Sequence, residues 1–189
     1  SLPDGLKTLG KGVFMDCVRL SDIKIPDSVT SIGKFAFSGC TSLTEITVPD
    51  GIKTLEDYFV SGCTSLTKVT LPDSIETIGQ AAFSGCQNLT EIKLPKNLKN
   101  LGFQVFGFCI SLTEIEIPEG VETLPYELFS SCEKLERVKL PSTLTRIEEA
   151  AFNACLSLKK IGIPDSVEYI HNTAFFDITL ETSRGSYAE

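Results

Sequence analysis

Residues 71–93 read Leu-Pro-Asp-Ser-Ile-Glu-Thr-Ile-Gly-Gln-Ala-Ala-Phe-Ser-Gly-Cys-Gln-Asn-Leu-Thr-Glu-Ile-Lys, and this 23-residue unit recurs along the chain. Eight of the nine prolines follow an apolar residue at this period, and Pro125 is the exception. All seven cysteines share the period: Cys17, Cys40, Cys63, Cys86, Cys109, Cys132 and Cys155. A fixed period of roughly 20–50 residues is typical of solenoids, in which each unit buries its apolar side against its neighbours.

The unit is numbered from the apolar residue before the proline, so that Leu71 occupies position 1. Apolar residues recur at positions 1, 5, 8, 13, 19 and 22, and position 13 is Phe in every unit except the one with Val60. That unit carries Phe59 one place earlier, which we interpret as a compensating exchange of volume inside one core. Positions 19, 22 and 1 form the pattern L-x-x-I-x-L, which predicts a short strand. Positions 12, 13 and 16 fit a single helical turn with one buried side.

The complete unit resembles the BspA-like class of leucine-rich repeats, in which the Cys follows the Phe as it does at Phe83 and Cys86. The resemblance implies a leucine-rich-repeat solenoid with a curved parallel β-sheet of short strands and single helical turns on the other sides of each coil. We therefore expect residues 1–189 to form a single domain of about eight coils, the first and last incomplete. It also implies a surface or secreted protein of a host-associated bacterium. Some members of the family act as adhesins for host matrix or plasma proteins.

Composition argues against several classes of function. The formal net charge of −8 argues against nucleic-acid binding. No run of about 20 apolar residues is present, so we expect no membrane-spanning helix. The single histidine, His171, has no Ser or Cys at a spacing typical of a catalytic pair. The sequence contains no phosphate-binding loop and no cluster of residues with the spacing of metal ligands. We expect a protein that is not an enzyme, without catalytic residues, cofactor or metal.

The cysteine column has three interpretations. Neighbouring cysteines would lie one coil apart, roughly 5 Å, which is compatible with a disulfide. Metal binding is a second possibility. Their number is odd, however, and no His, Asp or Glu shares their column, so we favour buried, reduced thiols that pack as small hydrophobes.

Two surfaces are candidates for contact with a partner. The outward face of the predicted strands is set by positions 21 and 23. Basic residues gather late in the chain at and beside these positions: Arg137, Lys139, Lys159 and Lys160. Aromatic residues outside the core period lie at positions 10 or 11, before the predicted helical turn: Phe35, Tyr58, Phe103 and Tyr126. Exposed aromatics are favoured at interfaces. A solvated strand face and aromatic packing at the edge of the core are the alternative interpretations.

The preferred hypothesis is a protein-binding or adhesion module of a bacterial surface or secreted protein, with a host matrix or plasma protein as the partner that the resemblance implies. The alternative is a structural spacer that displays other domains of a longer chain. We expect a monomer, or weak end-to-end association through the strand edges at the two ends of the array.

Overall fold

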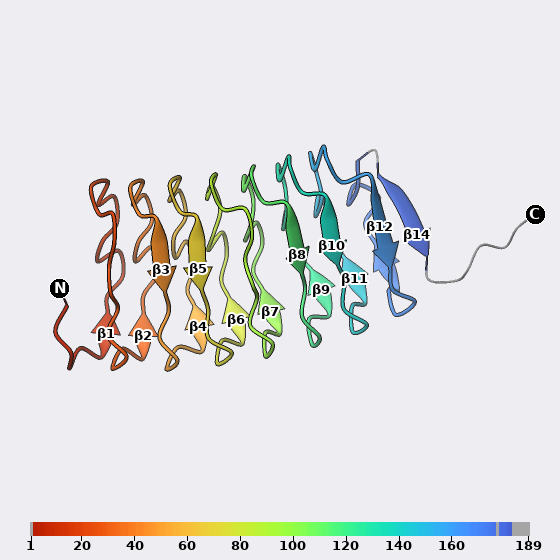
Figure 1. Cartoon of the computed structure of the whole chain (residues 1–189). Coiled ribbons are helices and arrows are strands. Elements are labelled where there is room, and N and C mark those ends of the chain that lie inside the picture. Colours follow the sequence, from red (N-terminus) through yellow and green to blue (C-terminus); the bar gives the residue numbers. More distant parts are fainter. Residues whose placement is uncertain (1, 177, 183–189) are drawn as a thin grey trace, which may run out of the picture.

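The computed structural model describes residues 2–176 and 178–182, which wind into a stack of coils running from the N-terminal to the C-terminal end (Figure 1). Each coil follows one 23-residue unit, and equivalent residues of neighbouring coils lie side by side. In the first pair of strands, for example, Thr8 lies beside Ser31 and Leu9 beside Ile32. The predicted parallel solenoid is confirmed.

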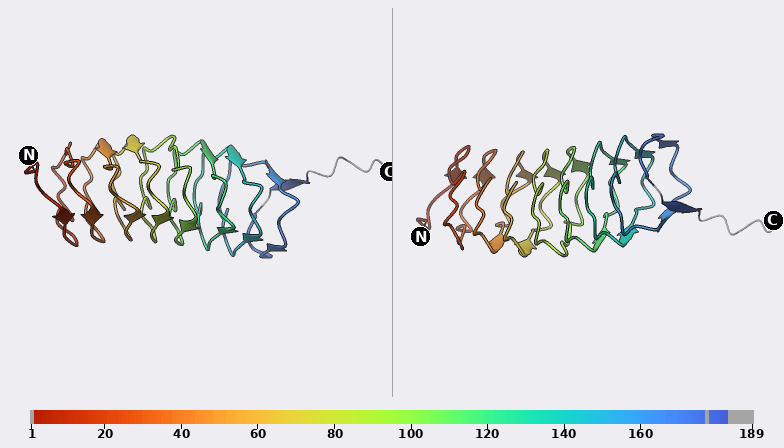
Figure 2. Two further views of the ribbon diagram at one scale, coloured as in Figure 1. Left: turned by 90° about the horizontal axis from the view of Figure 1, so that it is seen from below. Right: turned by 90° about the horizontal axis from the view of Figure 1, so that it is seen from above.

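The strands form two rows on opposite sides of the flattened coil, as Figure 2 shows. One row uses positions 7 and 8 of the unit. It consists of β1 (Thr8–Leu9), β2 (Ser31–Ile32), β4 (Thr54–Leu55), β6 (Thr77–Ile78), β7 (Asn100–Leu101), β9 (Thr123–Leu124), β11 (Arg146–Ile147) and β13 (Tyr169–Ile170). The other row, called the long-strand face, uses positions 21 to 23. It consists of β3 (Glu45–Thr47), β5 (Lys68–Thr70), β8 (Glu114–Glu116), β10 (Arg137–Lys139), β12 (Lys160–Ile163) and β14 (Thr179–Thr182). Strand β12 continues into position 1. The last strand, β14, comes earlier in its unit, at positions 17 to 20, and pairs with β12.

The predicted helical turns are wrong, because the described residues contain no helix. Residues at positions 11 and 15 have positive φ, such as 57° at Tyr58 and 73° at Gly62, and this left-handed conformation ends a right-handed helix. The amides between them bond to the next coil instead: Phe37 N donates to Phe59 O over 3.0 Å. The arm between the two rows is therefore a series of turns that is hydrogen-bonded from coil to coil.

A column of phenylalanine rings fills the space between the two rows. Neighbouring rings stack, as at Phe83 and Phe106, whose centroids are 5.6 Å apart with an angle of 5° between the rings. The predicted exchange of volume is confirmed: Phe59 is fully buried in this column beside Val60. Its ring meets Phe37 and Phe83 edge to face, at 89° and 85°.

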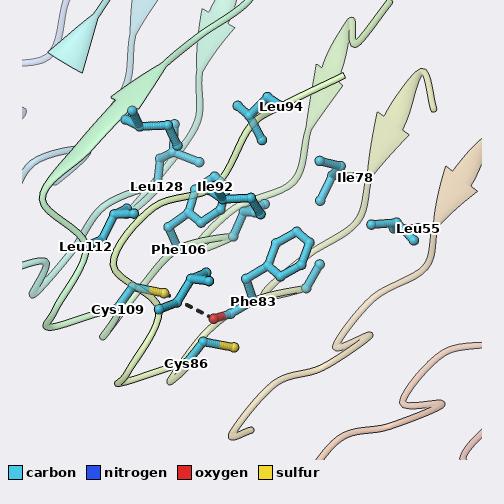
Figure 3. Close-up of a cluster of buried hydrophobic side chains, with 14 of the residues drawn as sticks. Leu55, Ile78, Phe83, Cys86, Ile92, Leu94, Phe106, Cys109, Leu112 and Leu128 are labelled. Atoms are coloured by element: carbon cyan, nitrogen blue, oxygen red, sulfur yellow. Dashed lines mark hydrogen bonds between the residues drawn. The ribbon is translucent and has the colours of Figure 1, made fainter. Parts of the chain in front are cut away.

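The cysteine column lies beside the rings, and all seven thiols are free, which fits the interpretation we favoured. Cys17, in the first coil, is exposed, and the other six are buried. Each buried thiol donates a hydrogen bond to a backbone carbonyl of the preceding coil. Cys109 Sγ donates to Phe83 O over 3.2 Å, as the dashed line in Figure 3 shows. Burial raises the pKa of Cys109 and Cys155 to about 12.

Replacing Cys109 should make stability less sensitive to alkaline pH. In the unfolded chain a thiol ionises near pH 9.0, whereas folded Cys109 keeps its proton until about pH 12. The contribution of this thiol is fully present below pH 9 and is lost as the pH rises through that window, because the unfolded state then binds fewer protons. In Cys109→Ala, the fall in unfolding free energy should be shallower by about 1.4 kcal/mol per pH unit.

Urea unfolding at several pH values between 8 and 11 measures this slope. Val105→Ala is the matched control, because it removes buried volume in the same part of the core without removing a titratable group, and it should keep the slope of the unmodified protein. A Cys109→Ala variant with an unchanged slope would contradict the assignment.

Candidate protein-binding surface

The long-strand face presents charged side chains to solvent. Alternate residues of a strand point to opposite sides, so Glu114 and Glu116 of β8 are exposed while Ile115 between them is buried. The same alternation places Arg137 and Lys139 of β10 on the outer surface. The core therefore constrains only every second residue of these strands, and the outward residues are available to a partner.

The predicted basic residues lie at the C-terminal end of this face, on β10, on β12 and immediately before β12. Three of the four form ion pairs with carboxylates on a neighbouring coil: Arg137 with Glu114 at 2.5 Å, Lys139 with Glu116 at 2.6 Å, and Lys160 with Glu181 at 3.2 Å. The carboxylates raise the pKa of the Arg137 and Lys139 side chains. Lys159 Nζ donates to Leu156 O over 2.7 Å. This part of the face is thus a set of ion pairs, and the exposed Glu136 adds a further carboxylate beside Arg137.

A hollow of about 640 Å³ opens on the same face, over β5, residues 91–93, β8 and β10. Its floor includes Val69, Ile92 and Ile115, and its walls carry both charges, among them Lys93 and Glu91. No motif in the sequence marks this hollow. Its lining comes from positions 21 to 23, where every complete unit places an apolar residue between two outward-facing ones, so the sequence does not single out these coils.

The four predicted aromatic residues form two separate pairs instead of a continuous stripe. Phe35 and Tyr58 are half-buried and stack with centroids 4.7 Å apart and 5° between the rings. Phe103 and Tyr126 lie 6.5 Å apart, and 41% and 43% of their surfaces are exposed. Gln80 lies in the coil between the pairs, and its Nε2 donates to the hydroxyl of Tyr58 over 2.5 Å.

Other chemistry is sparse in the described part of the chain. His171 Nδ1 lies 2.9 Å from Thr173 Oγ1, a contact within one turn. Across residues 2–176 and 178–182, no group of three or more His, Cys, Asp or Glu side chains is arranged to hold a metal ion. The same residues include no helix that could cross a lipid bilayer.

Comparison with known proteins agrees with this architecture. The model of a family described as BspA type leucine rich repeat region matches residues 7–136 and 53–181, with six copies of the repeat. A leucine-rich-repeat protein of T. pallidum of known structure is 34% identical, with a TM-score of 0.77, over 84% of this chain and 75% of that one. No curated protein matches the chain.

Two further solved structures are similar over 96% of this chain. A leucine-rich cell surface protein of Faecalibacterium prausnitzii is 26% identical over 70% of its own length, with a TM-score of 0.57. A leucine-rich-repeat protein of Bacteroides ovatus is 27% identical over 67% of its length, with a TM-score of 0.51.

The two aromatic pairs should differ in their energetic coupling. A double-mutant cycle on Phe35→Ala and Tyr58→Ala should give a coupling of about 0.5–1.5 kcal/mol, because these rings stack closely. The matched cycle on Phe103→Ala and Tyr126→Ala should give a smaller value, because those rings are farther apart and exposed. Urea unfolding of the single and double variants measures both couplings, and equal values would show that the second pair packs as tightly as the first.

Proposed function

Because this chain belongs to the BspA-type leucine-rich-repeat family, we propose that it is a protein-binding or adhesion module of a bacterial surface or secreted protein. The family is a non-enzymatic repeat scaffold, and leucine-rich-repeat proteins generally bind other proteins. The similarity to a protein described as a leucine-rich cell surface protein supports the proposed location.

The observation that carries the proposal is the separation of core and surface on the long-strand face. The buried residues at positions 19 and 22 hold the coil together, while positions 21 and 23 are charged or polar and exposed in most coils. A regular exposed surface of this kind is the usual binding site of a solenoid. The hollow over β5 and β8 is a depression in this surface that side chains of a partner can fill.

We assign the partner contact to the C-terminal end of this face, at Arg137, Lys139, Lys159 and Lys160. Carboxylates of an acidic partner segment would compete with Glu114, Glu116 and Glu181 for these cations. One exposed ion pair replaces another in such an exchange, so electrostatics would contribute mainly to the rate of association and to partner choice. The exposed rings of Phe103 and Tyr126 are the second contact that we consider, because aromatic side chains are enriched at interfaces.

The test is binding of the purified chain to immobilised host matrix and plasma proteins, followed by surface plasmon resonance at several salt concentrations. For a protein that binds, the variant Arg137→Glu with Lys160→Glu should associate at least about tenfold more slowly and with a weaker dependence on salt. The matched control is Glu45→Lys, at a residue that lies four coils before Arg137 on the same face and outside the hollow, and it should change association less.

Two outcomes would contradict the assignment. If the basic reversal leaves binding unchanged while Phe103→Ala or Tyr126→Ala abolishes it, the aromatic edge is the binding site. If no protein of the panel binds and the chain serves only to hold neighbouring domains apart in a longer protein, the spacer hypothesis replaces the binding module.

A further inference from the structure

The long-strand face is broken into three separate pairs of strands. β3 pairs with β5, β8 with β10 and β12 with β14, and each pair is a sheet of its own. Within each of the first two pairs, the amide at position 1 donates to the neighbouring coil: Val48 N to Thr70 O over 3.0 Å, and Ile117 N to Lys139 O over 2.9 Å. Residues 22–24 and 91–93 hold the same place in their coils and are not strands.

The closed pairs coincide with ion pairs at position 21. Residues at this position stack in a column along the face, 23 residues apart in sequence up to Lys160. Two ion pairs lie within the column, Glu45 with Lys68 at 3.9 Å and Glu114 with Arg137 at 2.5 Å. A third joins Lys160 of the column diagonally to Glu181, which lies beside Gly162 at position 23, at 3.2 Å. Each of these three pairs joins two strands that are also joined by backbone hydrogen bonds.

The junctions between neighbouring described coils where no ladder forms on this face are called seams. Two residues at position 21 beside these seams, Asp22 and Glu91, form no ion pair with any other described residue, and they lie in the two segments that are not strands. Lys68, the cation next to Glu91, pairs with Glu45 on its other side. Like charges meet where Asp22 precedes Glu45, where Glu91 precedes Glu114 and where Arg137 precedes Lys160, and no ladder forms at any of these junctions.

We propose that ion pairing at position 21 determines which neighbouring coils join on this face, so that the face is a row of two-stranded plates separated by seams. Opposite charges directly across two strands stabilise their pairing, and like charges oppose it. On the opposite side of the coil the ladder is interrupted at other junctions, between β2 and β4 and between β7 and β9, while β4, β6 and β7 run unbroken across the seams on both sides of residues 91–93. The seams on either side of residues 91–93 lie within the hollow. The charges at position 21 therefore determine where the hollow opens, without any change in the buried core.

Asp22→Lys tests the closing of a seam. The new lysine would face Glu45, and residues 22–24 should then join β3 as a strand. The coils already touch at position 20, where Thr44 N donates to Ser21 O over 3.2 Å, so only the following residues need to come together. Hydrogen exchange of the Ile25 and Glu45 amides should slow by about tenfold as ladder bonds form. Asp22→Asn removes the like charge without supplying a cation, and it should leave both amides at their original rates.

Arg137→Glu tests the opening of a plate. It places two carboxylates across β8 and β10, and exchange of the Ile117 amide should become about tenfold faster. The double variant Glu114→Arg with Arg137→Glu restores an opposite pair in the reverse order and should restore slow exchange. If Asp22→Lys leaves the Ile25 and Glu45 amides unprotected, or if Arg137→Glu leaves the Ile117 amide protected, the twist of the coils sets the seams and the proposal is overturned.

Discussion

The carbonyl oxygen at position 13 is the point through which each coil is joined both to itself and to its neighbour. Phe106 O accepts a hydrogen bond from Cys109 N of its own turn over 3.1 Å, and one from Cys132 Sγ of the next coil over 3.0 Å. The Phe106 amide donates onward to Leu128 O over 3.0 Å. Every coil can form these hydrogen bonds only if equivalent atoms recur after 23 residues. The 23-residue period of the sequence is therefore required by the geometry of the backbone.

This requirement explains why the repeating residue is cysteine. A thiol is small enough for the column beside the stacked rings, and its proton satisfies a buried carbonyl of the preceding coil. Alanine would fill less of the space and leave that carbonyl with one donor fewer. The first coil illustrates the role of the preceding coil in burying the thiol. Cys17 has no described coil before it, and its side chain is exposed.

Most of the fold could be predicted from the sequence, because the buried residues recur at fixed positions. The helical turns could not, since a buried pair at positions 13 and 16 fits a helix and a chain of turns equally well. Left-handed residues decide between them, and only some are glycine: Gly85 has a φ of 74°, while Ala81 in the same arm has 50°. The structure places the four basic residues at one end of the exposed face, and their role as a partner contact stays a prediction. Their ion pairs were missed, although Glu114 and Arg137 are 23 residues apart and so lie on neighbouring coils.

If contact between neighbouring coils in strict register holds this protein together, losing a whole coil should harm it less than losing part of one. Deletion of residues 48–70 joins Thr47 to Leu71, which reproduces the natural junction of Thr70 and Leu71. Deletion of residues 48–59 removes about half as many residues but takes every later coil out of register. In urea unfolding monitored by circular dichroism, the longer deletion should keep one cooperative transition at a lower midpoint, and the shorter deletion should lose it. A shorter deletion as stable as the longer one would contradict the account.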